Sequence, residues 1–273
     1  MPMRLLEARA VDDLAHQSHR TPDRELVTFR VMRVPAGVLS LGVSVALGLV
    51  VLSGGTARAV RGGGEVIGRS VDGRGILAFQ LGDPAGSPVL VVGCTDGDEP
   101  AGIAIVNALR RLHVPTGVDL WLLPTINPDG LAARTRGNAN GVDLNRNFPY
   151  AWQHLIGGFD SGPRPLSEPE TRAVYRLLLR VKPRLSICFH QPLALVDDSQ
   201  GSRSLERRFA RLVGLPLSPL ADYPGSITNW QNHRFTGSTA FVTELPAGGL
   251  RPAATLRYAR AILAVANAVS HQG

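Results

Sequence analysis

The sequence predicts an α/β protein with a three-layer α/β/α sandwich on a mixed, mostly parallel sheet. Short apolar runs of strand length alternate along the chain with segments of helical periodicity. These runs are residues 88–92, 118–126, 184–189 and 239–243. Their consecutive apolar residues are typical of strands that are buried on both faces. Strands and helices that alternate in this way form a sheet with a helical layer on each side.

The segments around these strands supply the remaining elements. Further helices are expected at about residues 103–112, 203–213 and 253–269. Ser167 is expected to cap a helix that runs to about residue 181, because Glu170 follows it at capping-box spacing. Residues 66–82 alternate around a Gly-Arg-Gly turn and suit a pair of antiparallel edge strands.

Residues 1–59 are interpreted as an N-terminal extension with a secretory signal, followed by one domain at residues 60–273. Residues 34–57 carry no charge, and the sequence Ala-Arg-Ala that ends at Ala59 has the form of a signal-peptidase site. A start at Met32 would give a leader of 28 residues. We therefore expect cleavage after Ala59 and a secreted protein.

A membrane anchor is the alternative for the same segment. If residues 34–57 are not cleaved, their 24 uncharged residues are long enough to span a bilayer, although Gly and Ser interrupt them. A membrane partner is expected only in that case.

The composition argues against a nucleic-acid partner. The 22 basic and 17 acidic residues of 60–273 leave a net charge of +5, and no basic cluster is visible in the sequence. Lys182 is the single lysine, so the basic residues are almost all arginine. Cys94 and Cys188 could form a disulfide after export, or remain reduced in the core.

Isolated polar side chains follow three of the expected strands. Asp96 and Glu99 follow the first, His190 follows the third and Glu244 follows the fourth. Three such side chains at one edge of a sheet can hold a catalytic metal, and a further carboxylate can act as a base. Taken singly each has an ordinary explanation, such as a helix-start acid or a glutamate paired with an arginine.

The stretch of residues 137–149 is rich in Gly, Asn, Asp and Arg and contains little that could pack in a core. Asn145 and Arg146 offer a carboxylate an amide donor and a guanidinium fork. The alternative is a surface turn with a solvated arginine. We expect a substrate-binding loop.

Six sequence blocks occur together in one order. They are GCTDGDEPAG at 93–102, TINPDGLAARTRGNANGVDLNRNFP at 125–149, SEPET at 167–171, CFHQP at 188–192, YPGSITNW at 223–230 and VTELP at 242–246. In this order and spacing the chain resembles the zinc carboxypeptidase family of metallopeptidases, especially its smaller bacterial members of the murein-peptide-amidase type.

The resemblance implies one zinc ion and a catalytic role for four positions. Glu99 and His190 match two zinc ligands. Glu244 matches the general base that acts on the zinc-bound water, and Arg136 matches the arginine that polarises the scissile carbonyl.

The resemblance also implies a site for the substrate. Asn145 and Arg146 match the pair that holds the terminal carboxylate, and Tyr223 corresponds loosely to a mobile tyrosine that covers the substrate. The expected substrate is a peptide or a peptidoglycan peptide.

Asp96 is the departure from the pattern, because the family has a histidine three residues before the glutamate. An aspartate can bind zinc. A ligand set of Asp96, Glu99 and His190 is therefore possible, and its oxygen-rich character would also suit Mn²⁺.

Three functions follow from these observations. The first is a secreted, metal-dependent carboxypeptidase or amidase that hydrolyses a peptide bond near a free carboxylate. The second is a catalytically impaired relative that binds peptide carboxylates. The third is an amidohydrolase of acylated amino acids on the same fold, which fits the long Asn-Arg block less well.

Overall fold

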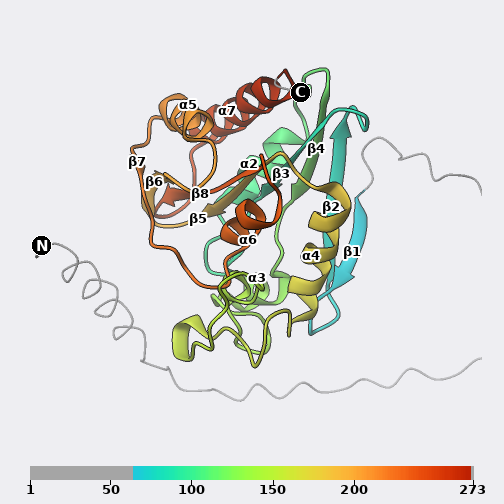
Figure 1. The fold of residues 1–273 in the computed structure, drawn as a ribbon, viewed down its shortest axis with the longest axis vertical. Coiled ribbons are helices and arrows are strands. Elements are labelled where there is room, and N and C mark those ends of the chain that lie inside the picture. Colours follow the sequence, from blue (N-terminus) through green and yellow to red (C-terminus); the bar gives the residue numbers. More distant parts are fainter. Residues whose placement is uncertain (1–63, 272–273) are drawn as a thin grey trace, which may run out of the picture. The chain divides into compact units, whose positions relative to one another are not determined.

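The computed structural model describes residues 64–271, which form a mixed eight-stranded sheet (Figure 1). The strands are β1 (Glu65–Arg69), β2 (Gly75–Gly82), β3 (Ser87–Val92), β4 (Val118–Leu123), β5 (Leu185–His190), β6 (Leu193–Asp197), β7 (Leu217–Ser218) and β8 (Thr239–Pro246). Their order in the sheet is β1-β2-β4-β3-β5-β8-β6-β7. The central strands β4, β3, β5 and β8 run parallel to one another, whereas β1, β2 and β6 introduce antiparallel pairs. The predicted mixed sheet and its antiparallel edge pair are confirmed.

Helices cover both faces of this sheet. The α-helices are α2 (Gly102–Leu109), α3 (Pro128–Ala133), α4 (Pro169–Val181), α5 (Arg203–Val213), α6 (Ile227–Arg234) and α7 (Pro252–Ser270), and the short 3₁₀ helices are η1 (Leu144–Arg146) and η2 (Gly157–Phe159). One buried cluster unites α2, α5 and α7, and a second lies beneath α4 and α6. Within the described residues, none of these helices is sufficiently long and apolar to cross a membrane.

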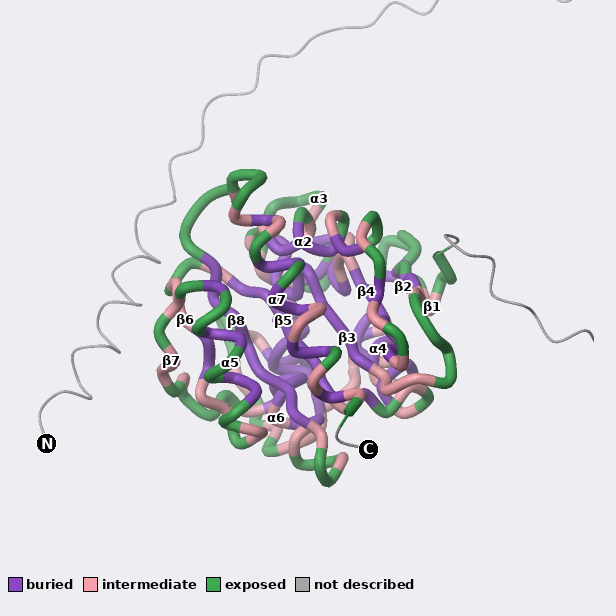
Figure 2. Tube along the Cα trace, turned by 90° about the horizontal axis from the view of Figure 1, so that it is seen from above, coloured by how far each residue is buried: buried purple, intermediate pink, exposed green. Residues whose placement is uncertain are grey.

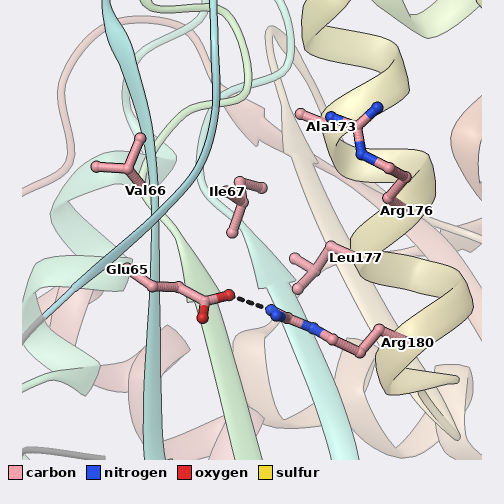
Figure 3. Close-up of a pocket in the computed structure, with 7 residues that line it drawn as sticks. All are labelled: Glu65, Val66, Ile67, Ala173, Arg176, Leu177 and Arg180. Carbon is pink, nitrogen blue, oxygen red and sulfur yellow. Dashed lines mark hydrogen bonds and ion pairs between the residues drawn. The ribbon is translucent and has the colours of Figure 1, made fainter. Parts of the chain in front are cut away.

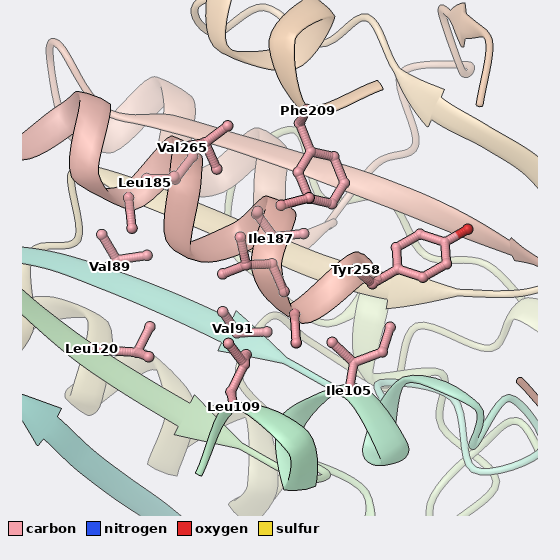
Figure 4. Close-up of a cluster of buried hydrophobic side chains, with 14 of the residues drawn as sticks. Val89, Val91, Ile105, Leu109, Leu120, Leu185, Ile187, Phe209, Tyr258 and Val265 are labelled. Carbon is pink, nitrogen blue, oxygen red and sulfur yellow. The ribbon is translucent and has the colours of Figure 1, made fainter. Parts of the chain in front are cut away.

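The alternation of side chains along β3 explains why the strand is apolar at every position. Val89 and Val91 belong to the cluster under α2 and α7, which Figure 4 shows. Leu90 and Val92 point the opposite way, into the cluster under α4 and α6. All four are essentially inaccessible to solvent, and Figure 2 shows the central strands as buried. A strand between two helical layers has no polar face, as the sequence predicted.

Some local predictions were wrong. The second strand ends at Leu123 rather than at residue 126. Ser167 does not cap α4, whose N-cap residue is Glu168 without a side-chain cap bond. The Ser167 hydroxyl instead donates to Glu168 Oε1 and accepts from Asn147, because the preceding loop folds back over the helix start. The strands β6 and β7 and the helices α3 and α6 were not predicted.

The edge strand β1 lies against α4. Between them is a hollow of about 310 Å³ that includes Val66, Leu177 and Arg176 in its lining (Figure 3). Glu65 and Arg180 form an ion pair across it. This pair is exposed, so we expect it to add little stability.

Both cysteines are free and buried, so the reduced alternative is the one in the structure. Cys94 Sγ donates to the carbonyl oxygen of Asp96 at 3.1 Å. Met32, the uncharged segment 34–57 and the expected cleavage point after Ala59 lie outside the described residues.

Candidate active site

The candidate metal ligands meet at the carboxyl ends of two neighbouring strands, β3 and β5. Asp96 and Glu99 lie in the loop after β3, and His190 is the last residue of β5. Because β3 and β5 are parallel neighbours, the loop after β3 lies beside the end of β5. Each residue offers one ligand atom, and these three atoms lie within 4.8 Å of one another.

Distances within this cluster are short. His190 Nδ1 lies 3.1 Å from Asp96 Oδ2 and 3.0 Å from Glu99 Oε2. Asp96 therefore reaches the site despite being shorter than a histidine. The backbone N–H of Gln191 also donates to Glu99 Oε2 at 3.0 Å, which fixes that carboxylate against the strand end.

Gly97 allows the loop to pass close to α3. A Cβ atom at Gly97 would lie 2.0 Å from the carbonyl carbon of Gly130, which is a severe clash. The N–H of Gly97 donates to the carbonyl oxygen of Arg136 at 3.3 Å. The loop between Asp96 and Glu99 is thus packed directly against the segment that carries Arg136.

Arg136 bridges the acidic groups of the site. Its Nη1 atom lies 2.8 Å from Asp96 Oδ2 and 3.2 Å from Glu99 Oε1, and its Nε atom donates to Asp143 Oδ2 at 2.8 Å. Burial would lower the pKa of Arg136, but Asp96, Asp143 and Glu99 outweigh it and raise that pKa. Arg136 is therefore a fixed, permanently charged group beside the candidate metal ligands.

Asn145 is positioned by contacts on both of its sides. Its N–H donates to Asp143 Oδ1 at 2.8 Å, and its Oδ1 accepts from the N–H of Ile227 at 3.1 Å. Its Nδ2 lies 3.4 Å from His190 Nε2. The structure thus brings Asn145 to the far side of the imidazole from Asp96 and Glu99.

Arg146 is 4% exposed, so the alternative of a solvated surface arginine is wrong. Its Nη1 donates to the carbonyl oxygen of Asn145 at 2.9 Å, and its guanidinium lies 4.3 Å from the ring centre of Tyr223 and 5.4 Å from that of Phe159. Within residues 64–271, no carboxylate lies within ion-pair distance of Arg146.

Glu244 is the cross-strand partner of His190 in the parallel pair β5 and β8. The carboxylate Oε2 accepts from the N–H of Leu193 at 3.4 Å. Burial is the largest influence on Glu244 and raises its pKa. The charge of His190 and the N–H of Leu193 lower this pKa, and Glu99 and Asp96 raise it further, so that the net direction is upward. A raised pKa suits a carboxylate that must accept and release a proton near neutral pH.

The structure therefore brings together every site residue that the sequence predicted, including the exposed Tyr223 over Arg146. Two neighbours of these residues were not predicted. Asp143 stands two residues before Asn145, a spacing typical of an Asx turn that could have identified it. Phe159 lies in η2, and its sequence gives no signal of a place under the two arginines.

Comparison with known proteins identifies the family to which this chain belongs. A model of the zinc carboxypeptidase family matches residues 64–196. Murein peptide amidase A of Escherichia coli is 34% identical over 193 residues, which cover 63% of this chain and 79% of the relative. The chain belongs to the zinc carboxypeptidase family. The resemblance that the six sequence blocks indicated is confirmed.

Two further comparisons agree. Murein peptide amidase A of Vibrio campbellii is 33% identical over 61% of this chain and 73% of its own length. The crystal structure of murein-tripeptide amidase from Escherichia coli O157 matches with a TM-score of 0.62 at 29% identity, over 77% of this chain and 96% of that chain. As a member of the zinc carboxypeptidase family, the protein is a hydrolase.

The residues present fit the zinc ion that the family implies. Two ligand atoms on one zinc ion are at most about 4.4 Å apart, and the two separations from His190 Nδ1 to the carboxylates are well inside that limit. Asp96 Oδ1 is buried and, among the described residues, has no hydrogen-bond partner. A buried carboxylate oxygen of this kind favours a cation.

The electrostatic surroundings of His190 also favour a metal ion. Burial would lower the pKa of His190, but the charges and hydrogen bonds of Asp96 and Glu99 raise it to about 10. The negative charge that favours a proton on Nδ1 equally favours a divalent cation at that place.

Proposed function

We propose that this chain is a secreted metal-dependent carboxypeptidase or amidase that hydrolyses an amide bond close to a free carboxylate in peptidoglycan peptides. Arg146 carries this proposal, because it is a buried cation without a carboxylate partner in the described part of the chain. A peptide carboxylate would complete it. The substrate class is supported by the similarity to murein peptide amidases.

Substrate binding follows from the two donors of the loop. Arg146 binds the carboxylate, and the Nδ2 group of Asn145 donates to it from the adjacent position. Tyr223 lies over Arg146 and is 43% exposed, so it can move without disturbing the core and cover the bound peptide. Because Asn145 Nδ2 lies 3.4 Å from His190 Nε2, we expect the amide bond next to a carboxylate held there to face His190.

Arg136 and Glu244 act on the amide bond. The Nη2 atom of Arg136 makes no hydrogen bond within residues 64–271, so it is available to the carbonyl oxygen as negative charge develops there. Glu244 takes a proton from the attacking water and returns it to the leaving amine. A zinc ion held by Asp96, Glu99 and His190 would supply Lewis-acid polarisation of the carbonyl.

The test combines metal binding with hydrolysis. The chain from residue 60 onward is titrated with Zn²⁺ and Mn²⁺ beside Asp96→Ala, and both proteins are then given murein peptides. Stoichiometric binding that Asp96→Ala abolishes, together with release of a new amine detected by mass spectrometry, supports the proposal. Turnover by Asp96→Ala at the wild-type rate would remove Asp96 from the ligand set.

A protein that only binds peptide carboxylates is the second candidate. The observation in its favour is the 2.8 Å ion pair of Arg136 with Asp96, which engages Arg136 where the family has a histidine at position 96. In that case calorimetry would show binding of the murein peptide that depends on Arg146, without hydrolysis in the presence of either metal.

Secretion is a separate part of the proposal and has a separate test. Export with cleavage after Ala59 predicts a protein outside the cytoplasm whose first residue is Val60. Fractionation of cells and N-terminal sequencing measure both. Retention of residues 34–57 in a membrane fraction would support the anchored alternative instead.

A further inference from the structure

The helices α5 and α7 lie side by side on one face of the sheet (Figure 1). Both helices carry exposed arginines. The exposed arginines are Arg207, Arg208 and Arg211 on α5 and Arg257 and Arg260 on α7. We call them, together with the groove described below, the arginine face. The fold thus gathers basic residues from two segments that are about 50 residues apart, which the sequence alone did not show as a cluster.

No acidic side chain balances this charge within the two helices. α7 contains no Asp or Glu, and the single acidic residue of α5, Glu206, is fully buried on the inner side of the helix. Arg203, at the start of α5, does pair with Asp198 at 2.8 Å. In residues 64–271 the five arginines of the face have no carboxylate within ion-pair distance.

A largely apolar groove of about 480 Å³ runs between the helices. Its lining includes Leu212 from α5, the α7 residues Leu256, Ala253 and Ala264, and the arginines Arg257 and Arg260. Leu212 is 42% exposed, so its side chain is accessible at this groove. Arg208 precedes Leu212 by one helical turn and therefore lies on the same side of α5.

The charge and the apolar residues of the arginine face indicate what kind of partner it can bind. Five exposed guanidinium groups that have no carboxylate partner in the described residues favour an anionic surface, and they disfavour a second copy of this face because like charges would meet. Leucine and alanine in the groove favour a partner that also offers apolar groups. Arg207 and Arg211 do not line the groove, so a peptide seated in it would contact Arg257 and Arg260 and leave these two arginines in solvent.

A bilayer with anionic headgroups satisfies both requirements across the whole face. Guanidinium groups bind phosphates with two hydrogen bonds, while the aliphatic stems of the arginines and the leucines reach the acyl boundary. Clusters of exposed arginines on a helical surface are attracted to bilayers that contain anionic lipids. We propose that the arginine face docks the domain on an anionic lipid bilayer.

The sample is residues 60–273, so that the uncharged segment 34–57 makes no contribution to vesicle binding. Both buried clusters consist of residues from the described domain. The solved murein-tripeptide amidase matches this domain over 96% of its own chain, so the fold stands without the N-terminal extension. The measurement is co-sedimentation of residues 60–273 with vesicles of phosphatidylcholine, with or without phosphatidylglycerol.

Two triple variants with the same change in net charge distinguish the face from general attraction. Arg208→Glu, Arg257→Glu and Arg260→Glu together should lower partitioning onto phosphatidylglycerol vesicles by about 100-fold or more. The matched control changes Arg69, Arg164 and Arg176 to Glu, three exposed arginines without ion pairs that lie outside α5 and α7. It should change partitioning several-fold at most.

The apolar part of the face has its own variant. Leu212→Gln with Leu256→Gln leaves the charge unchanged and should still weaken binding to phosphatidylglycerol vesicles, since the groove contributes contact with the acyl boundary. Thermal unfolding measured by circular dichroism confirms that each variant is folded. Equal losses in the two triple variants, equal binding to vesicles without phosphatidylglycerol, or binding to polyglutamate but to no vesicle would overturn the proposal.

Discussion

The two arginines of the active site, Arg136 and Arg146, have opposite electrostatic surroundings. Arg136 touches three carboxylates, those of Asp96, Glu99 and Asp143. Arg146 is more deeply buried, and among the described residues its neighbours are a carbonyl oxygen and two aromatic rings. Burial lowers the pKa of Arg146, and the charge of nearby Asp143 only partly offsets this.

This difference separates a positioning charge from a binding charge. A buried ion pair holds its partners in place because breaking it leaves an uncompensated charge. A buried cation without an anion is unfavourable until a ligand completes it. Arg136 therefore organises the candidate metal ligands, whereas Arg146 is the group that gains most from a substrate carboxylate.

The largest expected effect is that of Glu244→Gln. This variant tests whether turnover can be lost while the peptide and metal binding to which Arg136 and Arg146 contribute is kept. Removal of a general base should lower kcat by about 10²- to 10⁴-fold. Arg136, Arg146 and the metal ligands are unchanged, so peptide and metal affinity should remain within a few-fold of wild type. Steady-state kinetics and calorimetry measure the two quantities. Wild-type turnover by this variant would exclude Glu244 as the base.

Arg146→Gln tests the binding charge directly. Loss of the charged hydrogen bonds to a carboxylate should lower kcat/KM by about 10- to 150-fold. The same variant should treat a substrate whose carboxylate is blocked as an amide nearly as wild type does. Arg164→Gln, at an exposed arginine without an ion pair, is the matched control. An equal loss on both substrates would show that Arg146 supports the fold rather than the carboxylate.

The meeting of the candidate site residues could be predicted because parallel strands carry them to one edge of the sheet. A strand that is apolar at every position and ends in a polar residue carries that residue to the edge of the sheet. Glu99, His190 and Glu244 meet for this reason, since β3, β5 and β8 are neighbours with parallel register. The strand order places His190, Glu244 and the loop after β3 at one edge of the sheet, and the close packing of that loop at Gly97 sets where Glu99 lies within it.

Loop contacts could not be predicted in the same way. Phe159 reaches the two arginines through η2, a short turn in a Gly-rich segment without apolar periodicity. The pairing of Arg136 with Asp143 depends on how residues 134–143 fold back, which propensity does not determine. The strand β6 was missed because its pairing with β8 is a long-range contact at the antiparallel end of the sheet.

Asp96→His should give the candidate metal site the histidine that the family has at this position, and it changes the surroundings of Arg136. It removes the carboxylate that Arg136 contacts at 2.8 Å and supplies a neutral nitrogen ligand. Zinc affinity should rise by a factor on the order of 10, and preference for Zn²⁺ over Mn²⁺ should increase because nitrogen replaces oxygen. Competition titration with a chelator measures both. An unchanged affinity for zinc would mean that residue 96 does not contact the metal.

Glu206→Gln should have the smallest effect on activity, because Glu206 lies in α5 and not among the candidate site residues; it extends the comparison to a buried carboxylate without a cationic partner in residues 64–271 and tests the effect on stability. Glu206 accepts from Ser199 Oγ at 2.5 Å, but its Oε2 has no partner in the described residues. Burial, with added repulsion from Asp198 and Asp197, raises its pKa from 4.5 to about 7. Below pH 4.5 the folded and unfolded states both carry the proton, whereas between pH 4.5 and 7 the unfolded state alone releases it. The contribution of Glu206 to the free energy of unfolding should therefore fall as pH rises through this window, by about 1–3 kcal/mol, and stay constant above it. Glutamine cannot titrate, so denaturant unfolding of Glu206→Gln should lack this fall, and parallel profiles for the two proteins would contradict the assignment.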